Sequence, residues 1–526
     1  MTLLVTRRRA PLPARAAAIV AVLAAMFVAL VGGGAPASAS KPSAGRRVEF
    51  IIQLAPHASA LEGRNLVRSL GGSPGVDLRI IHGLSAKLTV RAAARLARNP
   101  LVRAVSPNAP LQETTLVNFS PDKMATNFDQ STAAARVWNH TTGRGVGVAV
   151  IDTGVEGDLP DFQTSQTNSA SRVIASAVID PNATAANDTY GHGTLVGGLI
   201  AGDGGYIPAG DPLWGRYAGT APDANLISIK ISDDSGNATT LDAIYGLQFA
   251  VDHKSDYNIR VVNLSFRSTS AQSYRTDPLD AAVEQAWLDG IVVVAAAGNL
   301  GTAPDAVSYA PANDPYVITV GAVDEQGTPT TNDDVPASWS SQGTTQDGFA
   351  KPDILAPGAH IASTLAPGSA FAGLCPTCVI GNNQYFQASG TSLAAPIVSG
   401  IAADLVAAHP GWTPSMVKGA IVNTATALPS GGGSELNAIA AYWASWGQLS
   451  SDQDLTPNSL IDPSTGTIDY SSASWSSGSW SVASGPLSAS WSSASWSCSD
   501  CSSGTGGPVN PTSGSWSSGS WSTYWG

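Results

Sequence analysis

Short apolar runs that alternate with helical segments over residues 112–442 restrict the possible fold more than any other feature of the chain. The runs are nearly continuous in apolar character, which is typical of parallel strands buried on both faces. The alternation predicts an α/β domain with a doubly wound, mainly parallel sheet, whose functional groups gather at the carboxyl ends of the strands. Strands are expected at 146–151, 226–229, 261–264, 291–294 and 316–320, and helices at 241–253 and 278–289.

A smaller unit precedes this domain at residues 41–110. Its first strand pattern ends at Pro56 and its first helix pattern ends at Gly71 and Gly72. The pattern predicts a compact α+β unit with two helices over one sheet. Its strands are expected at 48–54, 78–81, 84–90 and 101–105, and its helices at 60–70 and 91–98.

The first 39 residues have the pattern of a secretory signal peptide. Arginines precede sixteen uninterrupted apolar residues at 16–31, and Ala37-Ser38-Ala39 is a small-residue cleavage pattern. The apolar run is shorter than the roughly 20 residues that span a bilayer. No other stretch of the sequence is expected to be long enough to span a bilayer. We therefore expect a secreted, extracellular protein without membrane contact after signal cleavage.

Charge is divided unevenly along the chain. Residues 1–110 carry 15 Lys and Arg against 3 Asp and Glu, whereas residues 111–526 carry 12 against 36. A basic front and an acidic body are expected to attract each other, although some of the front charges belong to the signal. The acidic body argues against a nucleic-acid partner, because phosphate binding needs basic surface.

Residues 448–526 form a low-complexity tail of Ser, Gly and Trp. The octapeptide Ser-Trp-Ser-Ser-(Gly/Ala)-Ser-Trp-Ser recurs at 474–481, 490–497 and 515–522. Such a sequence normally forms a flexible linker, but dense tryptophan favours binding or aggregation. The tail is interpreted as a spacer, as an adhesive module for a surface or glycan, or as an extension strapped to the preceding domain.

Four cysteines occur as two Cys-x-x-Cys pairs, Cys375/Cys378 and Cys498/Cys501. Two such pairs could hold zinc, but disulfides are more common in an exported protein. Four cysteines permit three pairings, and the sequence does not choose among them.

Three short stretches have the residue types of nucleophilic catalysis. Asp152 ends a buried strand, His192 precedes a helix of small residues, and Ser392 begins another helix. Serine needs a base to remove its proton, histidine titrates near neutral pH, and a buried aspartate fixes the histidine tautomer. Each stretch alone is a weak signal, since each residue could be a turn or cap residue. Together and in this order they are far more specific.

A fourth stretch ends at Asn299, after a strand and a turn of small residues. Its side-chain amide could donate a hydrogen bond to an oxyanion, and the Ser392 backbone N–H at a helix start could be the second donor. The alternative is that Asn299 is only a turn residue.

With these motifs the chain resembles the subtilases, the subtilisin-like serine peptidases. Asp152-Thr-Gly, His192-Gly-Thr, Gly-Thr-Ser392-x-Ala-x-Pro and Asn299 after Ala-Ala-Gly match family segments, as does the segment 351–358. The resemblance implies a serine endopeptidase and an inhibitory propeptide at 41–110, with the end of the propeptide, between about 105 and 125, lying in the active-site cleft. It implies no cofactor for catalysis and permits structural calcium, for which no ligands are assigned.

The resemblance also implies a substrate-binding wall on each side of the cleft. The residues that form these walls are Ser265, Phe266, Arg267, Ala296, Ala297 and Gly298. Arg267 departs from the family, because glycine is usual there. An arginine at this position could favour acidic substrates or could point to solvent.

Two other function classes compete with an endopeptidase. In the first, the fold is a scaffold and the tryptophan repeats bind a surface or cell wall; the intact set of Asp152, His192, Asn299 and Ser392 argues against this. In the second, the α/β domain binds a nucleotide; this fails because no Gly-x-Gly-x-x-Gly follows the first strand.

Overall fold

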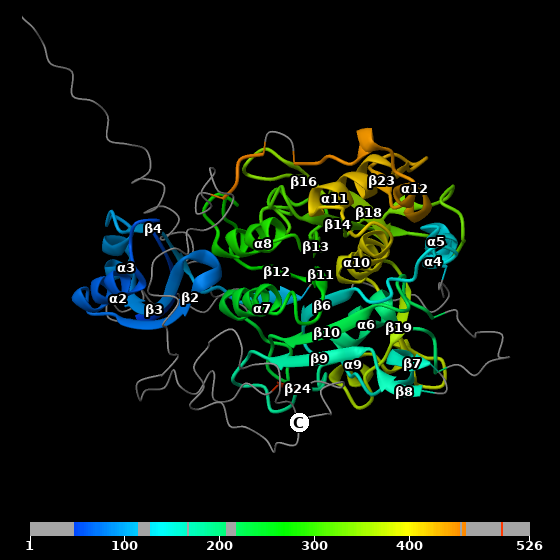
Figure 1. The fold of residues 1–526 in the computed structure, drawn as a ribbon, viewed down its shortest axis with the longest axis horizontal. Helices are drawn as coiled ribbons and strands as arrows, with labels where there is room; N and C mark the ends of the chain where they lie inside the picture. The colour runs from blue at the N-terminus through cyan, green and yellow to red at the C-terminus, as the bar shows by residue number, and fades with distance from the viewer. Residues whose placement is uncertain are drawn as a thin grey trace, which may run out of the picture.

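The computed structural model describes residues 47–113, 127–165, 168–206, 217–452 and 455–458, together with the backbone of 496–497. The signal-like segment and nearly all of the tryptophan repeats lie outside these residues. The described part has a small N-terminal lobe, coloured blue in Figure 1, beside a larger body.

The small lobe is a four-stranded antiparallel sheet with two helices against it (Figure 1). Helix α2 starts with a capping box, in which the Ser59 side chain accepts from the backbone of Glu62 and the Glu62 side chain accepts from the backbone of Ser59. Apolar side chains of the sheet and helices form a core of their own. The strand order is β2-β3-β1-β4, with β1 Arg47–Leu54, β2 Ser73–Leu78, β3 Gly83–Thr89, β4 Val102–Pro107, α2 Ala60–Ser69 and α3 Val90–Leu96.

The strand expected at 78–81 is wrong. Strand β2 ends at Leu78, and Arg79–Ile81 forms the 3₁₀ turn η1. Ile80 and Ile81 are buried in the core of the large body and not in that of the lobe. Their apolar character thus reflects burial between the two lobes, which sequence periodicity cannot distinguish from burial in a sheet.

The body is built on an eleven-stranded, mainly parallel sheet, which confirms the predicted fold class. The order is β22-β23-β18-β14-β13-β11-β6-β10-β9-β24, with β15 pairing β14. Seven pairs are parallel, and β15, β22 and β24 pair antiparallel at the margins. The strands are β6 Gly147–Asp152, β9 Val173–Val178, β10 Asn225–Lys230, β11 Ile259–Leu264, β13 Val292–Ala296, β14 Ile318–Asp324, β15 Val335–Pro336, β18 Ile354–Pro357, β22 Thr426–Ala427, β23 Ser434–Glu435 and β24 Trp496–Ser497.

Helices cover both faces of this sheet (Figure 1). Helices α7 (Thr240–Asp252) and α8 (Pro278–Leu288) pack together on one face, and α6 (His192–Ala201) packs against α10 (Thr391–Ala408) on the other. By length and composition α10 could cross a membrane, contrary to the expectation that no stretch after residue 31 could. It is however 89% buried within the body, as the core helix of the fold.

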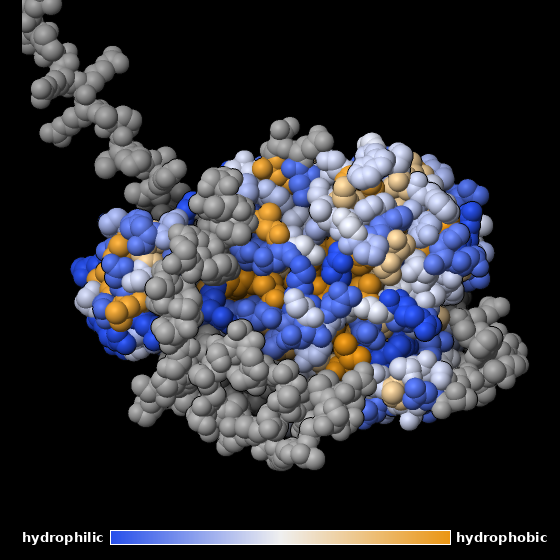
Figure 2. Space-filling model, in the orientation of Figure 1, coloured by the Kyte–Doolittle hydropathy of each residue, from blue (hydrophilic) through white to orange (hydrophobic). Residues whose placement is uncertain are grey.

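The body exposes little charge for its size. Figure 2 shows pale and blue residues over most of the uncovered face, with apolar residues in smaller patches. Only 13% of the chain is charged, so Ser, Thr, Asn, Gln and Gly supply much of the surface polarity.

Candidate active site

The sequence-predicted residues meet at the carboxyl edge of the sheet. Asp152 is the last residue of β6, at the centre of the strand order, and His192 is the first residue of α6. Ser392 is the second residue of α10, which packs against α6. This edge is where parallel α/β sheets place functional groups.

Asp152 and His192 form a buried pair. The His192 Nδ1 lies 2.7 Å from Asp152 Oδ1, and the two side chains are 3% and 4% exposed for Asp152 and His192. The Thr153 N–H also donates to Asp152 Oδ1, at 2.7 Å, which holds the carboxylate in place. An aspartate in this position fixes one imidazole tautomer, with the proton on Nδ1 and Nε2 able to accept.

A glycine lets the helix start this close to the strand. A Cβ on Gly193 would lie 2.0 Å from the carbonyl oxygen of Gly154 and 3.2 Å from the Cβ of Asp152. Since real Cβ atoms do not approach a backbone oxygen so closely, any larger residue would push His192 away from Asp152.

Asp188 positions the helix that carries His192, and the sequence analysis missed it. Its buried carboxylate accepts from the backbone N–H of Gly191 and of Thr194, both at 2.7 Å, and from the Thr153 hydroxyl at 2.8 Å. Burial raises the pKa of Asp188, while these hydrogen bonds oppose the rise. The carboxylate satisfies helix-start N–H groups and links α6 to the end of β6. Aspartate near a helix start was the available signal, but only the folded loop turns it inward.

Ser392 is held by a network that reaches back into the sheet. The Ser265 hydroxyl donates to the carbonyl oxygen of Ser392 at 2.8 Å and accepts from the Asn263 amide at 2.9 Å. The Asn263 carbonyl oxygen in turn accepts from the Ser399 hydroxyl at 2.9 Å. All four residues are buried, so the first turns of α10 are fixed against the end of β11.

The Asn299 side chain is oriented by the residue before Ser392. Its Oδ1 accepts from the Thr391 N–H at 3.0 Å and from the Thr391 hydroxyl at 3.1 Å. The same hydroxyl accepts from the Gly298 N–H at 3.0 Å. These contacts fix the side-chain amide with Oδ1 toward Thr391 and its NH2 group on the opposite side.

A loop clipped by a disulfide packs beside His192. The backbone N–H groups of Ala370 and Phe371 donate to the carbonyls of Thr189 and Tyr190, each at 3.1 Å. The buried Phe371 ring stands edge-on to the His192 ring, with centroids 6.0 Å apart. This loop contains α9 (Ala370–Leu374).

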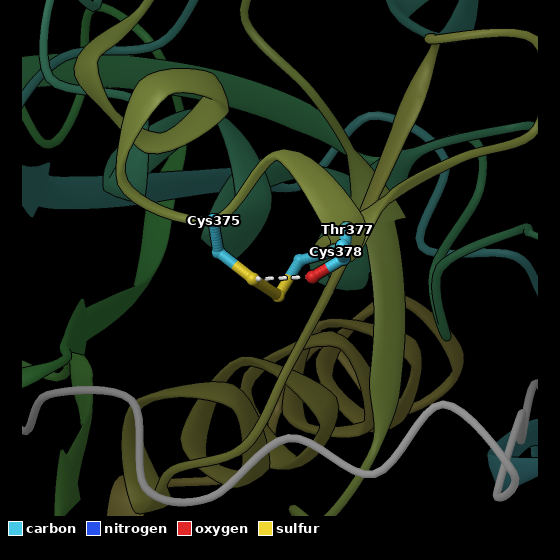
Figure 3. Close-up of a disulfide and its surroundings, with 3 residues drawn as sticks. All are labelled: Cys375, Thr377 and Cys378. Carbon is cyan, nitrogen blue, oxygen red and sulfur yellow. Dashed lines mark hydrogen bonds between the residues drawn. A yellow bond between two sulfur atoms is a disulfide. The ribbon is translucent and has the colours of Figure 1, made fainter.

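The loop ends in the Cys375–Cys378 disulfide, with an S–S distance of 1.99 Å (Figure 3). Of the pairings the sequence left open, the structure therefore has the one in which this pair closes on itself. Cys498 and Cys501 lie outside the described residues.

One candidate substrate-binding wall is already occupied by the N-terminal lobe's own chain. Strand β12 (Phe266–Ser268) pairs antiparallel with β5 (Leu111–Glu113), with Arg267 opposite Gln112. Leu111, Phe266 and Asp152 line the same small pocket. The second wall, Ala296–Gly298, continues β13, and Arg267 extends toward Gly298 from the first.

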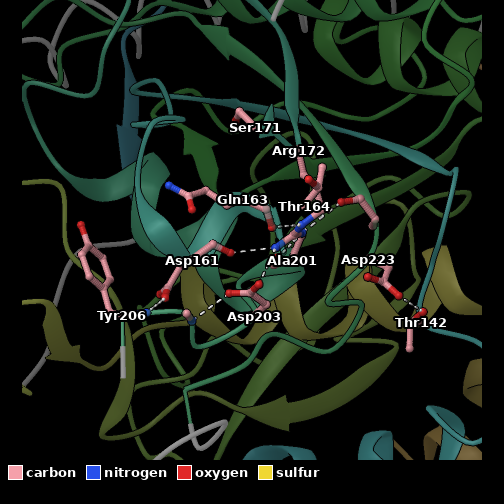
Figure 4. Close-up of polar contacts among 12 residues, drawn as sticks. Thr142, Asp161, Gln163, Thr164, Ser171, Arg172, Ala201, Asp203, Tyr206 and Asp223 are labelled. Atoms are coloured by element: carbon pink, nitrogen blue, oxygen red, sulfur yellow. Dashed lines mark hydrogen bonds and ion pairs between the residues drawn. The ribbon is translucent and has the colours of Figure 1, made fainter. Parts of the chain in front are cut away.

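No group of His, Cys, Asp or Glu in the described part of the chain is arranged to hold a metal ion. The most enclosed acid on this side, Asp161, accepts from the Thr364 hydroxyl, the Tyr385 hydroxyl and the Tyr206 N–H. Beside it Arg172 donates to the backbone carbonyls of Asp161 and Ala201 (Figure 4). Protein hydrogen-bond donors thus occupy the carboxylate oxygens of Asp161, and the positive charge of Arg172 lies beside them. This cluster therefore does not fit a structural calcium ion, which needs free oxygen ligands.

Comparison with known proteins agrees with this geometry. The model of the Subtilase family, Peptidase_S8, matches residues 143–442. The serine protease AprX of Bacillus subtilis is 38% identical over 305 residues, which cover 57% of this chain and 65% of AprX. Thermitase of Thermoactinomyces vulgaris is 32% identical over 60% of this chain and 90% of its own length.

A solved structure of a subtilisin-related enzyme also resembles this chain. Fervidolysin from Fervidobacterium pennivorans, a keratinolytic enzyme related to subtilisin, superposes with a TM-score of 0.58 and 25% identity over 77% of this chain and 62% of its own. The matched domain contains Asp152, His192, Asn299 and Ser392. The chain therefore belongs to the subtilase family, whose members are serine endopeptidases that need no cofactor for catalysis.

Proposed function

We propose that this protein is a secreted serine endopeptidase made as a zymogen, which removes its own N-terminal lobe. Ser392 is the nucleophile, His192 the general base and Asp152 the residue that orients the histidine. The observation that carries the proposal is the pairing of β5 with β12, because a chain segment lies along the wall where a substrate strand would lie.

Acylation starts when Ser392 Oγ attacks the carbonyl carbon of the scissile amide. The serine proton passes to Nε2 of His192, and the Asp152 carboxylate at Nδ1 stabilises the imidazolium that forms. The C–N bond then breaks, and His192 returns the proton to the leaving amine. Water attacks the acyl-enzyme in the reverse sequence, which releases the acid and restores Ser392.

Two donors face the charge that develops on the carbonyl oxygen. The Asn299 amide is aimed by its contacts to Thr391, and the Ser392 N–H belongs to the first turn of α10. Both are fixed before the substrate arrives, so little reorganisation is needed in the transition state.

The N-terminal lobe acts as the inhibitor of the enzyme that it precedes. The Thr240 N–H donates to the carbonyl of Ala109 at 2.8 Å, and the Leu111 N–H donates to the carbonyl of Ala238 at 2.8 Å. Arg79 pairs with Asp252 at 2.6 Å, so a basic lobe meets the acidic body. Ile80 and Ile81 add apolar contact to the same interface.

The test uses the full chain with Ser392→Ala and Asn299→Ala. We expect wild type to appear in the culture medium without its lobe and to hydrolyse casein, and Ser392→Ala to stay at full precursor length without activity. Asn299→Ala should process itself slowly and lose about 10²- to 10³-fold in kcat, the effect of removing one oxyanion donor. If purified Ser392→Ala lost its N-terminal lobe at the wild-type rate, self-maturation would be overturned.

A further inference from the structure

The side chain of Arg267 crosses the cleft between the two candidate substrate-binding walls. In β12 the neighbours Phe266 and Ser268 are buried, and Arg267 alone points to the other side of the strand. A Cβ placed on Gly298 would lie 3.3 Å from the Arg267 Cδ, so the aliphatic stem of Arg267 passes directly over the opposite wall.

The guanidinium is fixed beyond that wall. It lies over the ring of Tyr309, 4.7 Å from the centroid, and its Nη1 donates to the carbonyl of Ser268 at 3.1 Å. The Tyr309 hydroxyl donates to Asp305 at 2.5 Å, which places a carboxylate near the cation. Cation–π contact and a nearby negative charge both favour this position for the head group.

The register of β5 shows which substrate residue meets this side chain. Glu113 lies opposite Phe266, so a peptide bound as β5 is would place its next residue opposite Ser265. The Ser265 hydroxyl donates to the backbone carbonyl of Ser392, so the substrate residue opposite Ser265 lies nearest the nucleophile and is taken as the residue whose carbonyl is attacked. Its side chain enters the space between the walls, where the Arg267 stem lies.

We infer that Arg267 narrows the primary specificity subsite, so that the enzyme selects a small residue such as Gly, Ala or Ser immediately before the scissile bond. This inference rests on the proposed endopeptidase function and names its substrate class. Neither sequence-based alternative fits the geometry. The side chain does not extend into solvent, and its charge already faces Tyr309, Asp305 and a carbonyl oxygen, which lessens its attraction for an acidic substrate.

The test is a series of internally quenched peptides, Leu-Gln-Glu-X-Ser-Gly, with X as Ala, Phe or Asp, and with the cleaved bond identified by mass spectrometry. We expect wild type to prefer Ala over Phe by about 10²-fold in kcat/KM after X, the scale on which a pocket discriminates by size. Arg267→Gly should raise kcat/KM for Phe at least tenfold, which reduces the preference for Ala to about tenfold or less.

Arg267→Met and Tyr309→Ala separate size from charge. Methionine keeps an unbranched stem but carries no charge, so it should retain the preference for Ala if size decides. Tyr309→Ala removes the ring on which the Arg267 guanidinium lies and so frees the Arg267 side chain to move. It should raise kcat/KM for the Phe peptide even if Arg267→Gly does not fold. Equal wild-type rates for Ala and Phe, or a preference for Asp that Arg267→Gly abolishes, would overturn the inference alone. Failure of wild type to hydrolyse any peptide or casein would overturn the proposed function and this inference together.

Discussion

The described part of the chain contains two histidine–aspartate pairs of nearly equal length in very different surroundings. His192 Nδ1 lies 2.7 Å from Asp152 at the carboxyl edge of the sheet, and His253 Nδ1 lies 2.8 Å from Asp256 at the end of α7. The first aspartate side chain is 3% exposed and the second is 54% exposed. The first pair joins a strand to a helix, whereas the second joins residues three apart in sequence.

The comparison shows that the pair itself is not the active site. His192 has helix α6 fixed by Asp188, a buried carboxylate partner and a packed ring, Phe371. His253 has Phe249 stacked on it at 4.3 Å and a solvent-exposed partner. A buried aspartate fixes the tautomer of its histidine, whereas solvent screens an exposed one.

The largest expected difference between the pairs is in catalysis. Asp152→Asn should lower kcat by about 10⁴-fold, because the amide favours the wrong histidine tautomer. Asp256→Asn makes the same chemical change in the exposed pair and should leave kcat within about twofold. The kcat of both variants is measured by peptide hydrolysis. Thermolysin first cleaves the N-terminal lobe from the precursor, and a chelator then inactivates the thermolysin.

The same pair of variants contains its own control. Circular dichroism and thermal unfolding should show both proteins folded, so that a loss of activity reflects chemistry. Equal losses in the two variants would mean that burial and context do not distinguish the pairs.

Asp188 sharpens the comparison, since the exposed pair has no equivalent. Asp188→Ala removes the acceptor of the Gly191 and Thr194 N–H groups and lets His192 shift. We expect kcat to fall by about 10²-fold, the cost of a displacement near 1 Å, with KM changed less than about threefold. Asp188→Asn keeps one acceptor oxygen and should recover part of kcat. A fall in stability with kcat intact in both variants would contradict a positioning role.

Sequence reasoning singled out His192 and did not consider His253. Gly-His192-Gly-Thr carries glycines that permit close backbone approach, and Gly193 indeed abuts Gly154. His253 follows a helix and has no such flanks. The buried parallel strands were also predictable, because β6, β10 and β11 each contain a short, mainly apolar run. These are local patterns, which sequence records directly.

Features that depend on contacts between distant segments were not predictable. The turn η1 was read as a strand because Ile80 and Ile81 are buried by another lobe. The position of Arg267 was left open between acid recognition and solvent, since Tyr309 and Gly298 are distant in sequence. Asp188 was missed for the same reason. In each case the deciding partner is a residue that only folding brings near.

A third kind of buried acid extends the comparison, one that faces another acid instead of a histidine. Glu435 on β23 and Asp334 are both buried, and the two carboxyl groups interact electrostatically. Burial, followed by the contact with Asp334, raises the pKa of Glu435 to about 10. The folded protein thus keeps a proton between pH 4.5, the ordinary value, and about 10, whereas the unfolded chain releases it.

The contribution of Glu435 to stability should therefore be greatest below about pH 4.5 and should fall as pH rises toward 10. Glu435→Gln carries no titrating proton, so it should raise Tm relative to wild type by about 3 °C or more at pH 9 and by much less at pH 4. The measurement is calorimetry in the Ser392→Ala background, which prevents autolysis. Asp256→Asn is the exposed control and should not show this pH-dependent gain; an equal shift at both pH values for Glu435→Gln would contradict the proton held by Glu435.

The smallest expected effect is that of the exposed pair on the stability of the protein. Asp256→Asn should change the free energy of unfolding by less than about 1 kcal/mol, because water and salt screen a half-exposed ion pair. His253→Ala should cost more, since it also removes the stacking on Phe249. Denaturant unfolding at low and high salt measures both. If Asp256→Asn cost about 3–5 kcal/mol, as breaking a buried pair does, exposure would not be what separates the two pairs. The special status of Asp152 would then rest only on its position at the carboxyl edge of the sheet.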